Sequence, residues 1–157
     1  MPDMLVKLYD LPAAFPEEVF EKQNIVIRRA LAPDLVPVTR WIEKTFGAGW
    51  AGECTVAFAR QPISCFIAIR DGEVIGFACH EATCRGFFGP TGVDPSCRGL
   101  GIGRRLLLEC LQDMKNNGYA YAIIGGAGPV EFYEKSVGAT AIAGSIPGIY
   151  RDMLKNL

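Results

Sequence analysis

Apolar residues recur at helical spacing in two long segments of the sequence. Over 33–46, Leu35, Val38 and Ile42 lie three or four positions apart, which is typical of a helix with one buried face. The same spacing recurs over 103–116. A further helix is expected over 50–60, between a Gly-rich turn and Pro62, and a short one should begin at Pro129.

Shorter apolar runs, rich in branched and aromatic residues, predict strands. The hairpin turn Asp71-Gly72 joins two of them, and a turn over 83–86 leads to a third, which gives an antiparallel meander. The helix over 103–116 then separates two strands that should be parallel, because a strand–helix–strand crossover joins parallel neighbours. The expected strands are 24–31, 64–70, 73–81, 87–93, 119–124, 139–143 and 148–154. The fold class is therefore α/β (α+β), with a mixed, mostly antiparallel sheet flanked by helices.

The first 23 residues precede this pattern. Residues 4–9 form a β-like run, and 16–22 can form one or two helical turns with Pro16 in first position. Two interpretations of this leader remain open. It is an extra edge strand and turn packed on the body, which we favour, or it is a contact between subunits.

Length and charge narrow the classes of protein. A chain of 157 residues, half of them hydrophobic, is expected to form one domain over 1–157. The net charge is −1 and no basic stripe is present, which argues against nucleic acid as a partner. No apolar run approaches the roughly 20 residues of a membrane span, and the N-terminus lacks the features of a signal peptide.

The cysteines bear on compartment and on metal. None forms a C-x-x-C pair and most lie in apolar runs, so we expect reduced, buried thiols in a cytoplasmic protein and no metal site. The six are Cys54, Cys65, Cys79, Cys84, Cys97 and Cys110.

The candidate chemistry lies between the strand at 87–93 and the helix at 103–116. Glycines at 99, 101 and 103 let the backbone approach a ligand closely. The free N–H groups and dipole of the helix favour an anion, and Arg98, Arg104 and Arg105 add positive charge. A phosphate or pyrophosphate site is predicted. It is not a Walker loop, which needs Lys followed by Ser or Thr, nor a dinucleotide fingerprint, which follows a first strand.

Two motifs resemble those of one family. Arg98-x-x-Gly101-x-Gly103, behind Val93-x-Pro95, resembles the coenzyme A pyrophosphate motif of the GNAT superfamily of N-acetyltransferases. Phe132-Tyr133-Glu134-Lys135, followed by Gly138-Ala139, resembles its second signature with one residue more before the glycine. The resemblance covers 24–157 as the core.

The resemblance implies a function and a fold. The expected reaction is transfer of the acetyl group of acetyl-CoA to a primary amine of a small molecule or peptide, directly within a ternary complex. The implied GNAT fold has a splayed sheet, and a bulge near Pro90 would open the gap that a pantetheine arm occupies. Homodimers are common in the superfamily, so a homodimer is expected by analogy only.

The resemblance also implies roles for individual residues. The Val93 N–H would stabilise the oxyanion, and Tyr133 would act as general acid toward the leaving thiolate. No motif fixes the general base. Glu81 and His80, at the end of a strand, are candidates, although we favour a solvated strand end for each. Glu53 is a weaker candidate, since helix charges usually face solvent. The expected coenzyme contacts are Thr91, Gly92, Val93, Arg98, Gly99, Leu100, Gly101, Ile102, Gly103, Arg104, Gly126, Phe132 and Tyr133.

Two departures from the family keep other functions open. Gly126 stands where the family often has a pantetheine-binding Asn, and Pro129 stands where a small residue is common. An acyl-CoA sensor with the same fold and no turnover is therefore an alternative. A nicotinamide-dinucleotide binder is a third interpretation, but it needs an early Gly-rich turn that the sequence lacks.

Overall fold

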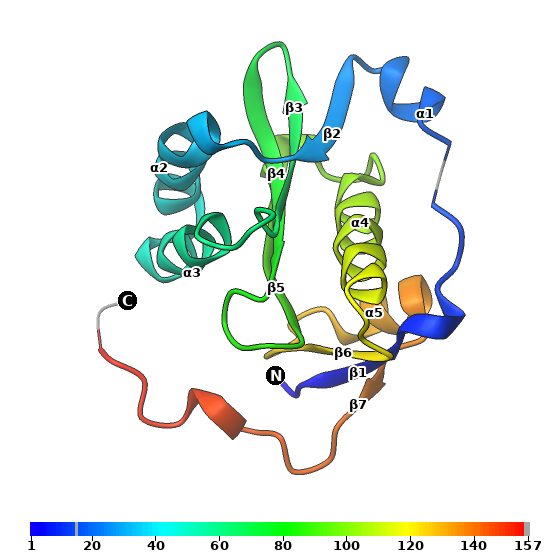
Figure 1. The fold of residues 1–157 in the computed structure, drawn as a ribbon, viewed down its shortest axis with the longest axis vertical. Coiled ribbons are helices and arrows are strands. Elements are labelled where there is room, and N and C mark those ends of the chain that lie inside the picture. The colour runs from blue at the N-terminus through cyan, green and yellow to red at the C-terminus, as the bar shows by residue number, and fades with distance from the viewer. Residues whose placement is uncertain (15, 156–157) are drawn as a thin grey trace.

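The sheet has strands from both ends of the chain. A computed structural model describes residues 1–14 and 16–155, and its seven-stranded sheet has the order β2-β3-β4-β5-β6-β1-β7 (Figure 1). The strands are β1 (Met4–Lys7), β2 (Ile25–Arg29), β3 (Cys65–Arg70), β4 (Glu73–His80), β5 (Phe87–Val93), β6 (Tyr121–Ile124) and β7 (Thr140–Ala141). The helices are α1 (Glu18–Glu21), α2 (Leu35–Phe46), α3 (Ala48–Phe58), α4 (Ile102–Asn116) and α5 (Val130–Val137).

Most pairings agree with the sequence. Strands β2 to β5 form an antiparallel series, and the Asp71-Gly72 turn joins β3 to β4 with both residues at positive φ. Strand β6 is parallel to β5. The mixed, mostly antiparallel sheet is confirmed.

Two hydrophobic cores cover the two faces of the sheet. On one face α4 buries Leu106, Leu107 and Leu111 completely, together with the side chains of β1, β5 and β6. On the other face, α2 and α3 pack Val38, Ile42 and neighbouring side chains on β3 and β4. Figure 1 shows these helices on opposite sides of the strands. None of the helices described is long and apolar enough to pass through a bilayer.

Strand β5 leaves β6 soon after they pair. The two strands are paired only at Phe87 and Phe88, and the register between β4 and β5 shifts beside Gly89 and Pro90. Two residues of β5 there oppose Cys79 alone, which is a bulge. The expectation of a bulge near Pro90 is thus confirmed, and the ends of β5 and β6 diverge beyond it.

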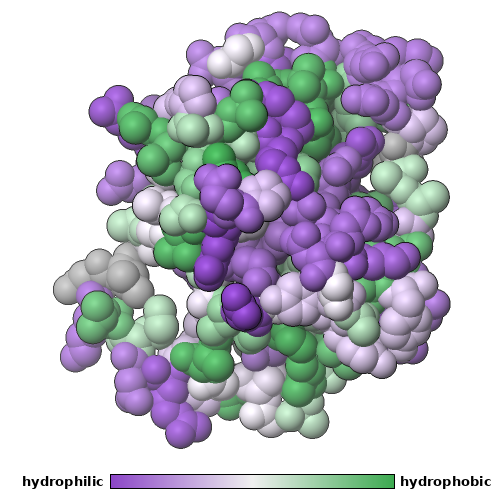
Figure 2. Space-filling view, viewed as in Figure 1, coloured by the Kyte–Doolittle hydropathy of each residue, from purple (hydrophilic) through white to green (hydrophobic). Residues whose placement is uncertain are grey.

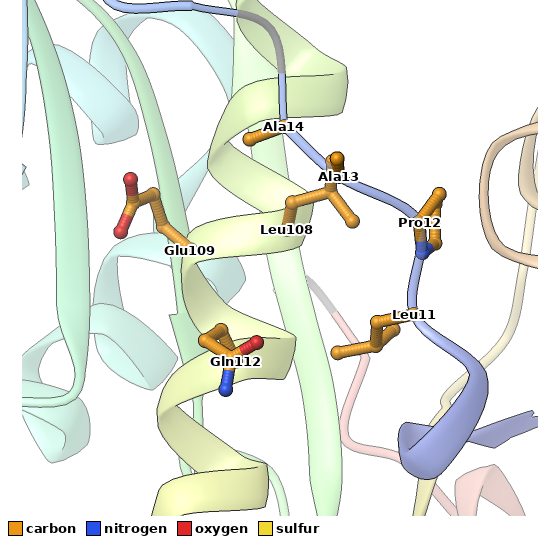
Figure 3. Close-up of a pocket in the computed structure, with 7 residues that line it drawn as sticks. All are labelled: Leu11, Pro12, Ala13, Ala14, Leu108, Glu109 and Gln112. Atoms are coloured by element: carbon orange, nitrogen blue, oxygen red, sulfur yellow. The ribbon is translucent and has the colours of Figure 1, made fainter.

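The leader is not an edge strand. Strand β1 lies between β6 and β7 and is antiparallel to both, with Met4 opposite Ile124 and Ala141. The edge-strand interpretation is therefore wrong. Alternate side chains of β1 are buried in the core, and the strand is paired on both sides. After it, residues 11–14 run along α4, where with Leu108, Glu109 and Gln112 they line a shallow hollow of about 190 Å³ (Figure 3).

The C-terminal segment differs from its prediction as well. Residues 148–150 form a 3-10 turn, and no strand follows in the described part up to residue 155. Strand β1 already occupies the free edge of β6 and pairs with β7, so the segment meets no partner there. Figure 1 shows it, in orange to red, passing the N-terminus toward α3, and Figure 2 shows it as a projection at the lower left.

Candidate active site

The divergence of β5 and β6 opens a large cavity. Its volume is about 1040 Å³. The cavity is lined by residues from seven segments: the β5 bulge, the loop before α4, the N-terminus of α4, the loop after β6, α5, α3 and the C-terminal segment. Segments far apart in sequence therefore meet at one cavity.

The part of the cavity lined by Arg98, Gly99 and residues 101–104, which we call the cradle, has features that suit an anion. Gly99 and Gly101 have φ of +85° and +83°, a left-handed conformation that disfavours other residues. Gly101 caps α4 by its backbone, and within the described chain no side chain caps this helix, so its first N–H groups are not used by a cap. Arg98 and Arg104 both line the cradle. Backbone donors, the helix dipole and two guanidinium groups all favour a diphosphate there.

The middle of the cavity is formed by the exit of β5. Thr91, Gly92 and Val93 line it, and the Thr91 hydroxyl donates to the Phe77 carbonyl at 3.1 Å. A Cβ on Gly92 would lie 2.5 Å from Cζ of Phe46. Gly92 therefore allows the ring at the end of α2 to pack directly on the strand.

Tyr133 lies on α5 beside the gap between β5 and β6. It is 5% exposed, and its ring packs edge-on against Phe132 at 5.2 Å and Phe88 at 6.3 Å between centroids. Burial raises the pKa of Tyr133 to about 12. The side chain lines the cavity, and its hydroxyl keeps its proton at neutral pH.

Another part of the cavity carries an acidic and aromatic group of side chains. Trp50 and Glu53, one helical turn apart on α3, line it together with Thr83. The Thr83 hydroxyl donates to Oε1 of Glu53, which holds this carboxylate in place. Glu53 is the one carboxylate among the cavity-lining residues of the described chain.

Glu81 lies elsewhere. Its carboxylate accepts a hydrogen bond from the Gly86 N–H at 2.6 Å and another from the Tyr119 hydroxyl at 2.9 Å. Glu81 itself has a positive φ of +57° and is not one of the residues that line the cavity. Its contacts brace the turn between β4 and β5.

Tyr150 of the C-terminal segment lines the cavity, and no motif in the sequence marks it. Its ring lies on the backbone of Gly125 and Gly126, so closely that a Cβ on Gly125 would meet the Tyr150 hydroxyl. Burial first, and then the negative charges of Asp3 and Glu53, raise the pKa of Tyr150 to about 12. The Gly126 N–H donates to Oδ1 of Asp3 at 2.8 Å, which ties this loop to the N-terminus.

Nearly all the site residues expected from the sequence lie around this one cavity. Leu100 and Glu81 are the exceptions. Other cavity-lining residues could not be predicted, because no local motif marks them and only the tertiary fold brings them to the cavity. They include Met1, Phe88, Cys97, Pro147 and Tyr150.

Comparisons with known proteins bear on the family and the fold. The sequence profile of the acetyltransferase (GNAT) family matches residues 35–139, more than half of the chain. No curated protein sequence matches. A GCN5-related N-acetyltransferase from Sphaerobacter thermophilus is similar in structure, with a TM-score of 0.64 and 20% identity over 90% of this chain and 48% of that one.

Two further structures are similar. One contains a GCN5-related glucosamine N-acetyltransferase region of a fungal multi-domain GH3 beta-N-acetylglucosaminidase, with a TM-score of 0.69 and 15% identity over 90% of this chain and 19% of that one. The other is a GNAT family acetyltransferase from Brucella melitensis in complex with acetyl-CoA, with a TM-score of 0.53 and 22% identity over 71% of this chain and 80% of that one. The chain thus spans half or less of the first two structures.

Proposed function

Since the chain belongs to the GNAT acetyltransferase family, we propose that it transfers the acetyl group of acetyl-CoA to a primary amine by direct transfer in a ternary complex. One observation carries the proposal. A single cavity joins an anion cradle, a gap between diverging strands, a protonated buried tyrosine and a carboxylate.

The residues present fit the coenzyme. Gly99 and Gly101 have left-handed φ values, and no side chain of the described residues caps the N-terminus of α4. Both features suit the binding of a diphosphate by backbone N–H groups. Beyond the bulge, the backbone of β5 no longer pairs with β6 and is free to bind an amide-bearing arm. Thr91, Gly92 and Val93 line that stretch.

Acetyl-CoA supplies an activated acyl group and a thiolate leaving group. We assign Tyr133 as the general acid for that thiolate, because burial keeps its hydroxyl protonated. We assign the Val93 N–H, at the end of β5, to the oxyanion that develops on the acyl carbonyl.

We assign the proton acceptor to Glu53 in preference to Glu81. A protonated amine cannot attack, so a base must lie where the acceptor binds. Glu53 lines the cavity, whereas both oxygens of Glu81 accept hydrogen bonds from groups that brace a turn.

The same part of the cavity indicates a class of acceptor. The Glu53 carboxylate and the rings of Trp50 and Tyr150 line the same cavity. Together they suit a ligand with one positive charge and an apolar or aromatic remainder. We infer that a small aromatic monoamine is a better acceptor than an amino acid, whose carboxylate would meet Glu53.

The test is incubation with acetyl-CoA and a panel of primary amines. Free CoA is measured by chromatography, because thiol reagents would also react with the protein's cysteines. The expected result is amine-dependent release, faster with phenylethylamine than with phenylalanine or spermidine. Binding of acetyl-CoA with no release on any amine would favour the acyl-CoA sensor, and failure to bind CoA would refute the site.

A further inference from the structure

Three cysteines that are distant in sequence meet in the core between α3 and the sheet. Cys65 on β3 lies directly opposite Cys79 on β4, so their side chains point to the same face. Cys54 on α3 covers that pair, with its Sγ 3.9 Å from Sγ of Cys65. All three sulfur atoms lie within 4.8 Å of one another, and all three residues are fully buried.

This spacing suits a single centre bonded to three sulfurs. Three sulfurs placed evenly in a plane about 2.3 Å from an ion, the length of a Zn–S bond, stand about 4.0 Å apart. The distance between Cys54 and Cys65 already has this value. A pyramidal centre brings the sulfurs slightly closer together.

The surroundings restrict which centre can bind. The neighbouring core residues are apolar, among them Val38, Ile42 and Phe77. In the described chain, no His, Asp or Glu joins the three thiols as a fourth ligand. Zn²⁺ in a structural site takes four ligands, and Cu⁺ on three thiolates would leave two negative charges in an apolar core.

We propose that Cys54, Cys65 and Cys79 form a three-thiol site for trivalent arsenic, taken up as arsenite. Arsenic in this oxidation state takes three ligands in a pyramid, and three thiolates cancel its charge. Each thiol replaces one hydroxyl of As(OH)₃: three S–As bonds form, three As–O bonds break, and three water molecules leave. No atom changes oxidation state. The product is neutral, so an apolar core does not disfavour it.

Binding would bond α3 to β3 and β4. Arsenite must reach three sulfur atoms that are fully buried between α3 and the sheet. Uptake by the folded protein should therefore be slow, and faster when the protein refolds with arsenite present.

The test measures the mass of the full chain after incubation, and after refolding, with sodium arsenite under reducing conditions. The expected product carries one arsenic atom and has lost three hydrogens. X-ray absorption at the arsenic edge should show three sulfur neighbours, and the melting temperature should rise. None of these readouts depends on acetyl transfer, so they separate this inference from the proposed function.

Matched variants locate the site. Cys54→Ala, and Cys54→Val as a variant that refills the volume, should lose the three-hydrogen product and the rise in melting temperature. Cys110→Ala should keep both, because Cys110 is equally buried but lies in the core on the opposite face of the sheet. Absence of the product in both native and refolded protein would overturn the proposal. So would its persistence in folded Cys54 variants, which would direct attention to Cys84 or Cys97.

Discussion

The Tyr133 ring is held between Phe88 and Phe132, and burial raises the pKa of its hydroxyl to about 12. A general acid has to be protonated when the leaving group departs, so the raised pKa of Tyr133 suits its proposed role across neutral and mildly alkaline pH. The ring contacts fix its direction.

Tyr133→Phe should lower kcat about 10²-fold and leave the affinity for CoA nearly unchanged, because only the hydroxyl is lost. CoA release and calorimetric titration with CoA measure the two effects. Tyr121→Phe, at a tyrosine that is 49% exposed, is the control and should change neither. A Tyr133→Phe variant that turns over at the normal rate would remove the acid from the mechanism.

Glu53 and Glu81 allow a paired experiment on the general base. Glu53→Gln should lower kcat/KM by about 10²-fold or more at neutral pH, since an amide cannot accept the proton. Glu81→Gln should leave the rate nearly intact and lower the free energy of unfolding by about 1 kcal/mol, because it weakens hydrogen bonds to Gly86 and Tyr119. Steady-state kinetics and urea titration measure both. The opposite pattern would restore Glu81 as the base.

The sequence indicated some site residues and not others for a physical reason. The glycines of the cradle, Arg98 and Tyr133 belong to contiguous motifs, so they could be predicted. Glu53 was only the weaker candidate base and Tyr150 was not expected, because both belong to the site through the packing of α3 and the C-terminal segment beside β5 and β6. The meeting of Cys54 with Cys65 and Cys79 depends on strand register and helix packing, which no spacing in the sequence records.

Among the elements, β2, β4 and α4 are joined by one polar cluster. The Arg29 guanidinium donates to both oxygens of Asp113 at 2.7 and 3.0 Å, and His80 Nε2 lies 2.8 Å from Oδ2 of Asp113. Burial lowers the pKa of His80 despite the nearby carboxylate. Burial would raise the pKa of Asp113, but hydrogen bonds from Arg29 and His80 outweigh it and hold that pKa below its ordinary value.

The lowered pKa of His80 and the lowered pKa of Asp113 both make the protein less stable in acid. In the unfolded chain His80 takes up a proton near pH 6.5, whereas in the folded chain it does so only at a lower pH. The free energy of unfolding therefore falls as pH decreases below about 6.5. The stability that Asp113 contributes is present above its unfolded pKa of about 3.9, and it is lost as pH falls through the lower folded value.

Asp113→Asn should therefore reduce the free energy of unfolding by about 2 kcal/mol at pH 7, and by less near pH 3, where the wild-type carboxylate also becomes protonated. Urea titrations at pH 7, 5 and 3 follow the difference. Glu109→Gln, which weakens the i,i+4 pair with Arg105 on the same helix, is the control at about 0.5 kcal/mol or less. If the loss of unfolding free energy in Asp113→Asn does not change with pH, the charge of Asp113 is not its cause.

Element boundaries could be predicted where the sequence carries its own signal. The Asp71-Gly72 turn needs positive φ, and the apolar face of α4 repeats at helical spacing, so both were expected correctly. The strand expected over 148–154 is absent because a strand forms only beside a partner. Strand β1 occupies the edge of β6, and β7 pairs over only two residues.

Considered as a whole, the molecule depends on its first residues. Met4, Val6 and Leu8 are fully buried and belong to the core beneath α4, and strand β1 joins β6 to β7. The Ala127 N–H donates to the Pro2 carbonyl at 2.8 Å, which connects the leader to a loop that lines the cavity. The leader therefore supports both the sheet and the site.

Deletion of residues 1–9 should abolish the cooperative thermal transition and CoA binding together, because β6 loses a neighbour and three core side chains disappear. Val6→Ala, a milder change, should cost about 2 kcal/mol, whereas Lys7→Ala at an exposed position of the same strand should cost little. Circular dichroism melts follow all three. A deleted protein that melts at the wild-type temperature would return the leader to a peripheral role.

The position of β1 also constrains how the protein is made. On the ribosome β1 emerges first, yet its partners on β6 and β7 lie around residues 121–124 and 140–141. Strands β2 to β5 have neighbours close in sequence and can assemble during translation, but β1 must wait until residues 121–124 of β6 have left the exit tunnel. In that interval its apolar side chains are exposed to chaperones and to other nascent chains.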